Sequence, residues 1–333
     1  TTSFTIDEQD TGADESGIQI TYYRINSGSW TTYAVAFNVG SEANGTVTIE
    51  YYSVDNVDNI QTTQSLEVQL DKNAPVSSIS FTPEHLTDFV NATTSFTITE
   101  DDDGTTESDI QITYYRINSG SWTTYAGTFN VGSEANGTVT IEYYSIDNVD
   151  NIQATQSLEV QLDRNAPVSS ISFTSEHLTD FVNATTSFTI NEQDAGADES
   201  DIQITYYRVN GGPWTTYVGA FNVGSEPNGT VTIEYYSLDN VDNIQATQSL
   251  EVQFDKNAPI TSLSYTPEHG TNFVNATTSF TLNEQDAGAD ESDVQITYYR
   301  VNSGSWNTYA GAFNVGSEPN GTVTIEYYSV DNV

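Results

Sequence analysis

The sequence predicts an all-β protein made of tandem two-sheet sandwich domains. Three observations support this prediction: a long internal repeat, short segments in which apolar and polar residues alternate, and the absence of helical spacing among apolar residues. The tryptophans mark the repeat, because Trp30, Trp122, Trp214 and Trp306 lie 92 residues apart. A period of this length in a 333-residue chain indicates a few copies of one domain.

The Asn-Ala-Pro segments of the repeat are typical of linkers between domains. Division at these segments gives two complete copies and two incomplete ones, of which the first lacks the opening strand and the last lacks the closing strand. The predicted domains are residues 1–72, 73–164, 165–256 and 257–333. We therefore expect the chain to be a window of a longer repetitive polypeptide.

Within residues 73–164, seven short segments rich in Thr, Val, Ile, Tyr and Phe are predicted strands. In order they read VSSISFT, TTSFTIT, DIQITYYRIN, WTTYA, GTFNV, GTVTIEYYSI and SLEVQL. Turn residues separate them: an Asn-Ser-Gly turn follows the third strand, Asn136-Gly137 is a hairpin signal, and Pro167 stands at the next linker. Seven strands with turns at this spacing favour a sandwich of two sheets.

The side chains that face the core are predicted from the period of two along each strand. The inward positions of the second copy are Ile79, Phe81, Phe96, Ile98, Ile110, Ile112, Tyr114, Val139, Ile141, Tyr143, Leu158, Val160 and Leu162. The Tyr-Tyr-Arg step of the third strand places Arg116 where it can stack on an aromatic ring or pair with a carboxylate such as Glu142. We expect the four Trp to pack within the hairpin of the third and fourth strands.

The run YYRINSGSWTTY, followed by GTVTIEYYSIDNVDN and LEVQLDRNAP, resembles the tandem immunoglobulin-like repeats of bacterial and archaeal adhesins and S-layer-type surface proteins. Ser16-Gly17-Ile18 also matches a signature of such repeats, although later copies read Ser-Asp. The sequence departs from the family pattern at Asp58, where Gly is usual. The resemblance spans the whole chain and implies seven-stranded immunoglobulin-like domains in an extracellular protein of the cell surface.

Acidic residues dominate the charge of the chain. Asp and Glu number 47 against 7 Lys and Arg, which gives a formal net charge of -40. A compact chain of this charge repels itself unless cations or salt offset the repulsion, and it is a poor partner for nucleic acid or an anionic membrane. There is no Cys for a disulfide or a thiolate site, and no apolar run is long enough to span a membrane.

Many carboxylates of each copy fall in the loop between the second and third strands, in the last hairpin, and in the linker. In an immunoglobulin-type sandwich these segments meet at the pole where the chain enters from the preceding domain. Clustered carboxylates on loops suit Ca²⁺, which takes about six to eight oxygen ligands, whereas Zn²⁺ prefers His and Cys. The alternative is a set of solvated acidic loops in a protein adapted to salt, although acidity of that kind is spread over the surface. The predicted calcium ligands are Asp71, Glu100, Asp102, Asp103, Glu107, Asp109, Asp147, Asp150, Asp163, Glu192, Asp194, Asp198, Glu199, Asp239 and Asp242.

Asn-X-Ser/Thr sequons occur at two positions of the repeat and are candidate N-glycosylation sites. Their number is what chance predicts for this composition, and the Asn-Gly pairs of one set already have a role as hairpin turns. The candidates are Asn44, Asn91, Asn136, Asn183, Asn228, Asn275 and Asn320. His85, His177 and His269 have no second His or Cys nearby, so we expect no catalytic or metal role for them.

These features predict a structural protein rather than an enzyme. We expect an acidic array that forms or extends a filament, stalk or surface coat outside the cell, with calcium at the domain junctions. Its expected partners are neighbouring repeats of the same longer chain or other copies of it. The alternative is an adhesin or glycan-binding module that holds surface glycans with its loops or its Trp/Tyr face, and an accessory region of an enzyme is a third interpretation.

Overall fold

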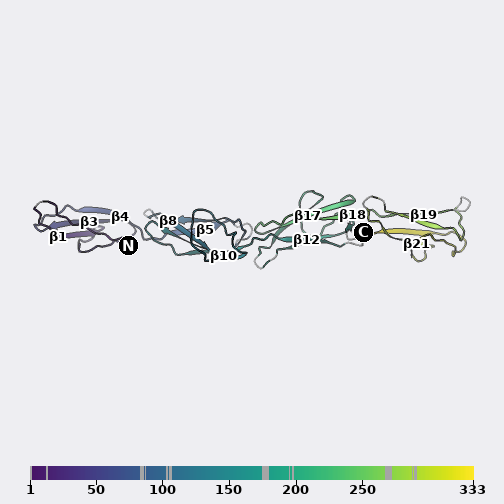
Figure 1. The fold of residues 1–333 in the computed structure, drawn as a ribbon, viewed down its shortest axis with the longest axis horizontal. Helices are drawn as coiled ribbons and strands as arrows, with labels where there is room; N and C mark the ends of the chain where they lie inside the picture. Colours follow the sequence, from purple (N-terminus) through teal and green to yellow (C-terminus); the bar gives the residue numbers. More distant parts are fainter. Residues whose placement is uncertain are drawn as a thin grey trace. The chain divides into compact units, whose positions relative to one another are not determined.

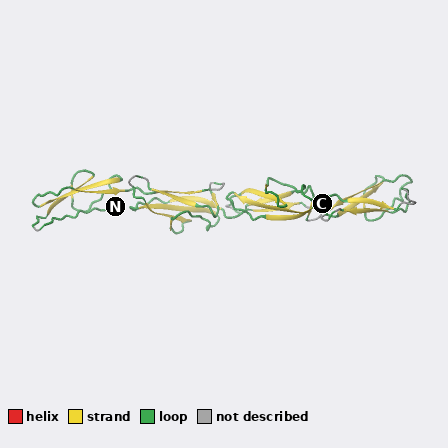
Figure 2. Ribbon diagram, turned by 90° about the horizontal axis from the view of Figure 1, so that it is seen from above, coloured by secondary structure: helices red, strands yellow, loops and turns green. Residues whose placement is uncertain are grey.

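The computed structural model describes residues 2–12, 14–82, 86, 88–102, 104, 107–174, 180–194, 196, 199–266, 272–286, 288 and 291–333. These residues form twenty-three strands and no helix. Figure 1 labels several of the strands, and Figure 2 colours strands yellow and loops green. No helix able to cross a membrane is therefore present in this part of the chain. The chain falls into two compact units that divide chiefly after Leu162, and each unit contains two copies of the repeat.

The strands recur from copy to copy. The first copy contains β1 (Ile18–Ile25), β2 (Thr31–Thr32), β3 (Gly45–Asp55) and β4 (Gln64–Leu70). The second contains β5 (Val76–Phe81), β6 (Phe89–Val90), β7 (Phe96–Asp101), β8 (Ile110–Ile117), β9 (Thr123–Thr124), β10 (Gly137–Asp147) and β11 (Gln156–Leu162). The third contains β12 (Val168–Phe173), β13 (Phe181–Val182), β14 (Phe188–Gln193), β15 (Ile202–Val209), β16 (Thr215–Thr216), β17 (Gly229–Asp239) and β18 (Gln248–Phe254). The fourth contains β19 (Ile260–Tyr265), β20 (Phe280–Gln285), β21 (Val294–Val301), β22 (Asn307–Thr308) and β23 (Ile325–Asp331).

Each complete copy has two sheets. In the second copy β5 pairs with β7, and the other sheet has the order β6-β11-β10-β8-β9. In the third copy β12 pairs with β14, and the other sheet has the order β13-β18-β17-β15-β16. Neighbouring strands are antiparallel, except that β6 and β13 run parallel to β11 and β18. The prediction of tandem all-β sandwich domains is confirmed.

The strands of the second copy differ from the prediction in three places. WTTYA contributes only the two residues of β9, and GTFNV contributes a single bridge between Phe129 and Phe96. The third difference is β6, an unpredicted strand next to Asp88, whose carbonyl oxygen accepts a hydrogen bond from the amide of Gln161. Segments of one or two paired residues are too short to display a period of two, so alternation could neither detect nor delimit them.

The core of the second copy follows the predicted alternation on most strands, and Phe96 and Leu162 are fully buried. The third strand, β8, is the exception, because Thr113 is the buried residue and Ile112 and Tyr114 lie on the other face. The register between β8 and β10 shifts near the start of β8, and such a bulge exchanges the inward and outward positions that follow it. The prediction that Ile112 and Tyr114 face the core is therefore wrong.

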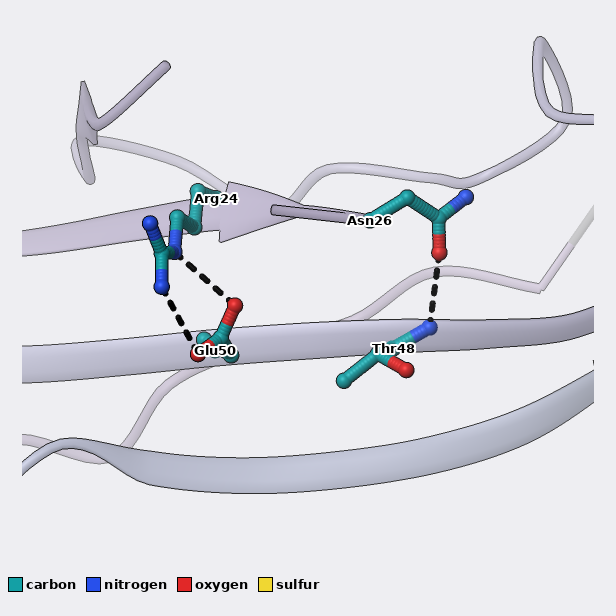
Figure 3. A network of polar contacts seen from close by, with 4 residues as sticks. All are labelled: Arg24, Asn26, Thr48 and Glu50. Carbon is teal, nitrogen blue, oxygen red and sulfur yellow. Dashed lines mark hydrogen bonds and ion pairs between the residues drawn. The ribbon is translucent and has the colours of Figure 1, made fainter. Parts of the chain in front are cut away.

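The opposite face of the larger sheet carries an ionic and aromatic cluster in each copy. Figure 3 shows Arg24 on β1 donating to both carboxylate oxygens of Glu50 on β3, at 2.8 and 2.9 Å. The guanidinium also lies over Trp30, 4.5 Å from the ring centroid, and Trp30 packs edge-on against Tyr52. The equivalent Arg116 makes the same two contacts, so both partners predicted for it are present.

Candidate cation site

Three groups of acidic side chains contain residues that recur one repeat apart. In each group, one oxygen from every residue lies within 4.8 Å of an oxygen from each of the others. The groups are Asp71, Asp102 and Glu107; Asp163, Asp194 and Glu199; and Asp255, Asp286 and Asp331. The structure thus brings linker carboxylates together with carboxylates from the copy that follows.

The second group shows how the strands position these residues. Asp163 directly follows β11 at the start of the linker, and it is fully buried. Asp194 directly follows β14, and Glu199 lies just before β15. The loop joins the end of β14 to the start of β15, so it lies at one end of the sandwich. The linker enters at that end, which brings both loop carboxylates close to Asp163.

Hydrogen bonds hold the linker carboxylate in place. Asp163 Oδ1 accepts from the amide of Asn165 at 3.0 Å, and Oδ2 accepts from the amide of Ser200 at 2.9 Å. Asn165 Nδ2 donates to Glu199 Oε1 at 3.0 Å, which joins the linker to the loop a second time. The same three bonds recur in the first and third groups. The linker is therefore a fixed part of each group.

The loop aspartate is the member whose bonding is incomplete. Both carboxylate oxygens of Asp194 are buried, and neither accepts a hydrogen bond of acceptable geometry. The same is true of both oxygens of Asp102, and of one oxygen each of Glu107 and Glu199. A buried charged oxygen without a partner costs free energy unless a cation or a proton compensates it. These oxygens are thus available to a bound ion.

The carboxylates also raise one another's pKa. Burial, followed by the charges of Asp163 and Asp239, raises the pKa of Asp194 from 3.8 to about 6, and the nearby amide of Asp201 offsets only part of this rise. Burial and a hydrogen bond shared with Asp163 raise the pKa of Glu199 to about 7. The two loop carboxylates of the first group are shifted in the same direction. Each group is therefore short of positive charge.

Asp147 and Asp239 lie fully buried beside these groups, at the ends of β10 and β17. Their oxygens are already occupied. Asp239 Oδ1 accepts from the amides of Val241 and Asn243 at 2.9 and 2.8 Å, and Oδ2 accepts from Asn243 Nδ2 at 2.8 Å. These aspartates hold the hairpin together and add negative charge to the site. In the third group Asp331 stands at the same position and is one of the converging residues.

Other predicted ligands stand apart from the three groups. Asp150 and Asp242 lie in the hairpin loop with φ of 65° and 63°, a left-handed conformation that Asp tolerates better than most residues. This explains how Asp replaces the Gly that is usual at this position. Glu100, Asp109, Asp150, Glu192 and Asp242 are all exposed. Asp103 and Asp198 lie outside the described residues.

Sequence reasoning missed the third group and its neighbour Glu291. The signal that finds it is the motif Asp-X-Gly-X-X-Glu-Ser, which begins at Asp10, Asp102, Asp194 and Asp286. The Gly has a steric role, because a Cβ at Gly196 would overlap the carboxylate of Glu199. The linker Asn that donates to the Glu was also missed, since an uncharged residue gives no sign of a cation site.

The sequons fall into two structural settings. In the set at Asn91, Asn183 and Asn275, the side-chain oxygen accepts from the amide and the hydroxyl of the Thr two residues later. In the other set, Nδ2 is buried at Asn44 and Asn136, Nδ2 of Asn228 donates to Asp255 and Glu291, and Asn320 is exposed. Because Nδ2 is the atom that would carry a glycan, three members of the second set have that atom enclosed or engaged.

No protein-family profile and no curated protein matches the chain. Solved structures do resemble it, and three of them are described below. The fibronectin(III)-like modules of CbhA from Clostridium thermocellum are 12% identical over 54% of this chain and 95% of theirs, with a TM-score of 0.32. A tetra-tandem repeat from the extending region of a large adhesion protein is 14% identical over 97% of this chain and 90% of its own, with a TM-score of 0.30. A 1.5-MDa bacterial ice-binding adhesin is 14% identical over 79% of this chain and 98% of its own solved chain, with a TM-score of 0.34. We base the function on the acidic groups themselves.

Proposed function

We propose that the chain is part of an extracellular structural array, a filament, stalk or surface coat, whose domain junctions bind Ca²⁺ and are stiffened by it. The observation that supports this most directly is the set of buried carboxylate oxygens without hydrogen bonds at Asp102 and Asp194. These oxygens lie beside a linker carboxylate that is already fixed by hydrogen bonds. A cation at this point would satisfy them and join the linker to the following copy.

The chemistry of the groups favours Ca²⁺ over other common ions. All the converging side chains offer carboxylate oxygens, and neither His nor Cys is among them, which disfavours Zn²⁺. Ca²⁺ accepts carboxylates with one or both oxygens in tolerant geometry, whereas Mg²⁺ demands a near-ideal octahedron. Calcium sites of extracellular modules bind at about 10⁻⁴ to 10⁻³ M, so an extracellular location would keep such sites filled.

Calorimetry of the full chain with Ca²⁺ and with a chelator tests this proposal. We expect the melting temperature to rise with Ca²⁺, because an ion that binds only the folded state adds about 2.7 kcal/mol per site at a concentration one hundred times its Kd. Mg²⁺ and NaCl at equal ionic strength are the controls, and they should raise the melting temperature less. An equal melting temperature with Ca²⁺ and with the chelator would contradict the calcium proposal.

An adhesin or glycan-binding role is the second candidate. Trp214 and Trp306 favour it, because they keep 36% and 41% of their surface exposed on the outer sheet face. Arg208 and Arg300 already cover one face of these rings, 4.5 Å from each centroid, which leaves less ring surface for a sugar. Binding to a glycan array would separate this candidate from a purely structural role.

A further inference from the structure

The linker between the third and fourth copies bonds to both of them in alternation. Asp255 Oδ2 accepts from the amide of Ser292, in the following copy, at 2.9 Å. The side chain of Lys256 points toward the preceding copy, where its Nζ donates to the carbonyl oxygen of Glu226 at 2.8 Å. Asn257 then donates to Glu291 in the following copy at 3.1 Å. Successive side chains of an extended segment point in opposite directions, which produces this alternation.

Asn228, in the turn before β17, brings the preceding copy into the acidic group itself. Its Oδ1 accepts from the amide of Lys256 at 3.2 Å. Its Nδ2 donates to Asp255 Oδ1 at 3.3 Å and to both oxygens of Glu291 at 3.2 Å. One amide side chain thus contacts the linker, the linker carboxylate and the loop carboxylate. In the first copy Asn44 Oδ1 accepts the same bond from Lys72 at 3.1 Å, but its Nδ2 is buried without a hydrogen-bond partner, so only the bond to the linker amide recurs there.

We propose that Asn228 is a latch that couples occupation of the acidic group to the orientation of the preceding domain. The proposal rests on the calcium function proposed above. An ion held by Asp255, Asp286 and Asp331 would fix the carboxylate of Asp255, and a fixed acceptor orders the amide of Asn228 that donates to it. Without this amide the ion still joins the linker to the following copy, but the preceding copy loses one of its ties to the site.

The latch also gives the sequon at Asn228 a role. A glycan on Asn228 would be attached to the nitrogen that donates to Glu291 and would place a bulky sugar inside the junction. The Asn-Gly-Thr turn at Asn228 is therefore assigned to the contact between the third and fourth copies.

The test uses the full chain, which has no Cys, so that T216C and T308C give unique positions for two spin labels. Thr216 and Thr308 are exposed on the short strands β16 and β22, on either side of the junction. The width of the distance distribution between the labels is measured with Ca²⁺ and with a chelator, and Ca²⁺ affinity is measured by calorimetric titration. In the otherwise wild-type chain we expect the distribution to narrow with Ca²⁺.

N228A should bind Ca²⁺ with an affinity within about threefold of wild type, a difference of ~0.7 kcal/mol in binding free energy. Its distance distribution should no longer narrow when Ca²⁺ is added. N320A is the matched control, because Asn320 is the same turn residue in the fourth copy and has no following acidic group in this chain, and it should behave as wild type. An equal melting temperature of N228A and wild type in chelator checks that the variant folds. If N228A binds Ca²⁺ and its label-to-label distance distribution narrows as much as that of wild type, the latch is wrong but the calcium function is not. No calcium binding by the wild-type chain would overturn the calcium function and the latch with it.

Discussion

The first and third copies contain the same acidic loop in two different settings. In the third copy Asp194 and Glu199 lie beside the linker aspartate Asp163. In the first copy Asp10 and Glu15 stand at the equivalent positions, and the 92-residue period puts the corresponding linker position before the first residue of this sequence. There Asp10 Oδ2 accepts from the amide of Gly17 at 2.9 Å, whereas neither oxygen of Asp194 accepts a well-formed bond.

The hairpin aspartates of the same two copies differ in burial and in whether a linker aspartate lies nearby. Asp55 and Asp239 accept equivalent hydrogen bonds from the residues two and four positions later in their loops. For Asp55, burial acts to raise the pKa, but these hydrogen bonds outweigh it and the pKa is lowered. For Asp239, burial dominates, Asp163 adds its charge, and the pKa is raised. The two hairpin aspartates therefore differ chiefly in burial, and the charge of the linker aspartate adds to the rise in the pKa of Asp239.

The largest difference between the two copies should appear in Ca²⁺ binding when one loop carboxylate is removed from each. D194N should weaken Ca²⁺ binding at its site at least about tenfold, because loss of a supporting residue alone often costs ~10–100-fold in metal affinity. D10N is the matched control and should leave the number of bound ions unchanged. Calorimetric titration gives both the number and the affinity of the sites. Equal losses in the two variants would mean that the linker does not define the site.

The second largest expected effect is a dependence of folding stability on pH. Asp194 and Glu199 have folded-state pKa values of about 6 and about 7, above their ordinary 3.8 and 4.5. The folded state therefore keeps protons that the unfolded state has lost, so the stability that these groups contribute is present below about pH 4 and is lost as the pH rises through about 6 to 7.

In chelator we thus expect the melting temperature to fall from pH 5 to pH 8, by ~2–4 °C for each kcal/mol. Saturating Ca²⁺ should remove this fall, because the ion keeps the carboxylates deprotonated in the folded state. Melting curves across this range are the measurement. A melting temperature that rises with pH in chelator would contradict the assigned shifts.

The smallest effect is expected from a methyl group in the loop. A Cβ at Gly196 would overlap the carboxylate of Glu199, and a Cβ at Gly12 would lie 2.6 Å from Glu15 Oε1. The carboxylate is the far end of a flexible side chain and can move aside, so the melting temperature of G196A in chelator should change little. Gly12 has a φ of 158°, so G12A should lower the melting temperature through backbone strain. G196A should nevertheless weaken Ca²⁺ binding a few-fold, whereas G12A should have no effect on it. Titration of both variants decides whether the position of Glu199 matters.

The general fold was predictable because the repeat and the alternation of residues are properties of the sequence alone. The inward face of β8 was not predictable in full, since a bulge shifts its register and both faces of Ile-Gln-Ile-Thr-Tyr-Tyr carry apolar residues. Thr113 is buried there, where it shares a 2.6 Å hydrogen bond with Ser145, and a polar residue gives no hydrophobic signal.

The site was predictable in its location and less so in its membership. The charge pattern identified the linker and the loop, because topology brings these segments together. The charge pattern could not distinguish Asp102 from Asp147. The carboxylate oxygens of Asp102 accept no well-formed hydrogen bond, whereas those of Asp147 accept hydrogen bonds from residues of its own hairpin loop. Nor could the charge pattern indicate Asn228, because the partners of that residue lie 27 and 63 positions further along the chain.

Each acidic group takes one carboxylate from a linker and the others from the copy that follows. A site therefore belongs to a pair of copies, and the four copies of this chain form three such groups among the described residues. Duplication of the 92-residue unit adds negative charge and, in the same step, one more acidic group of this kind. If these groups bind cations as we propose, the number of cation sites grows in proportion to the length of the array.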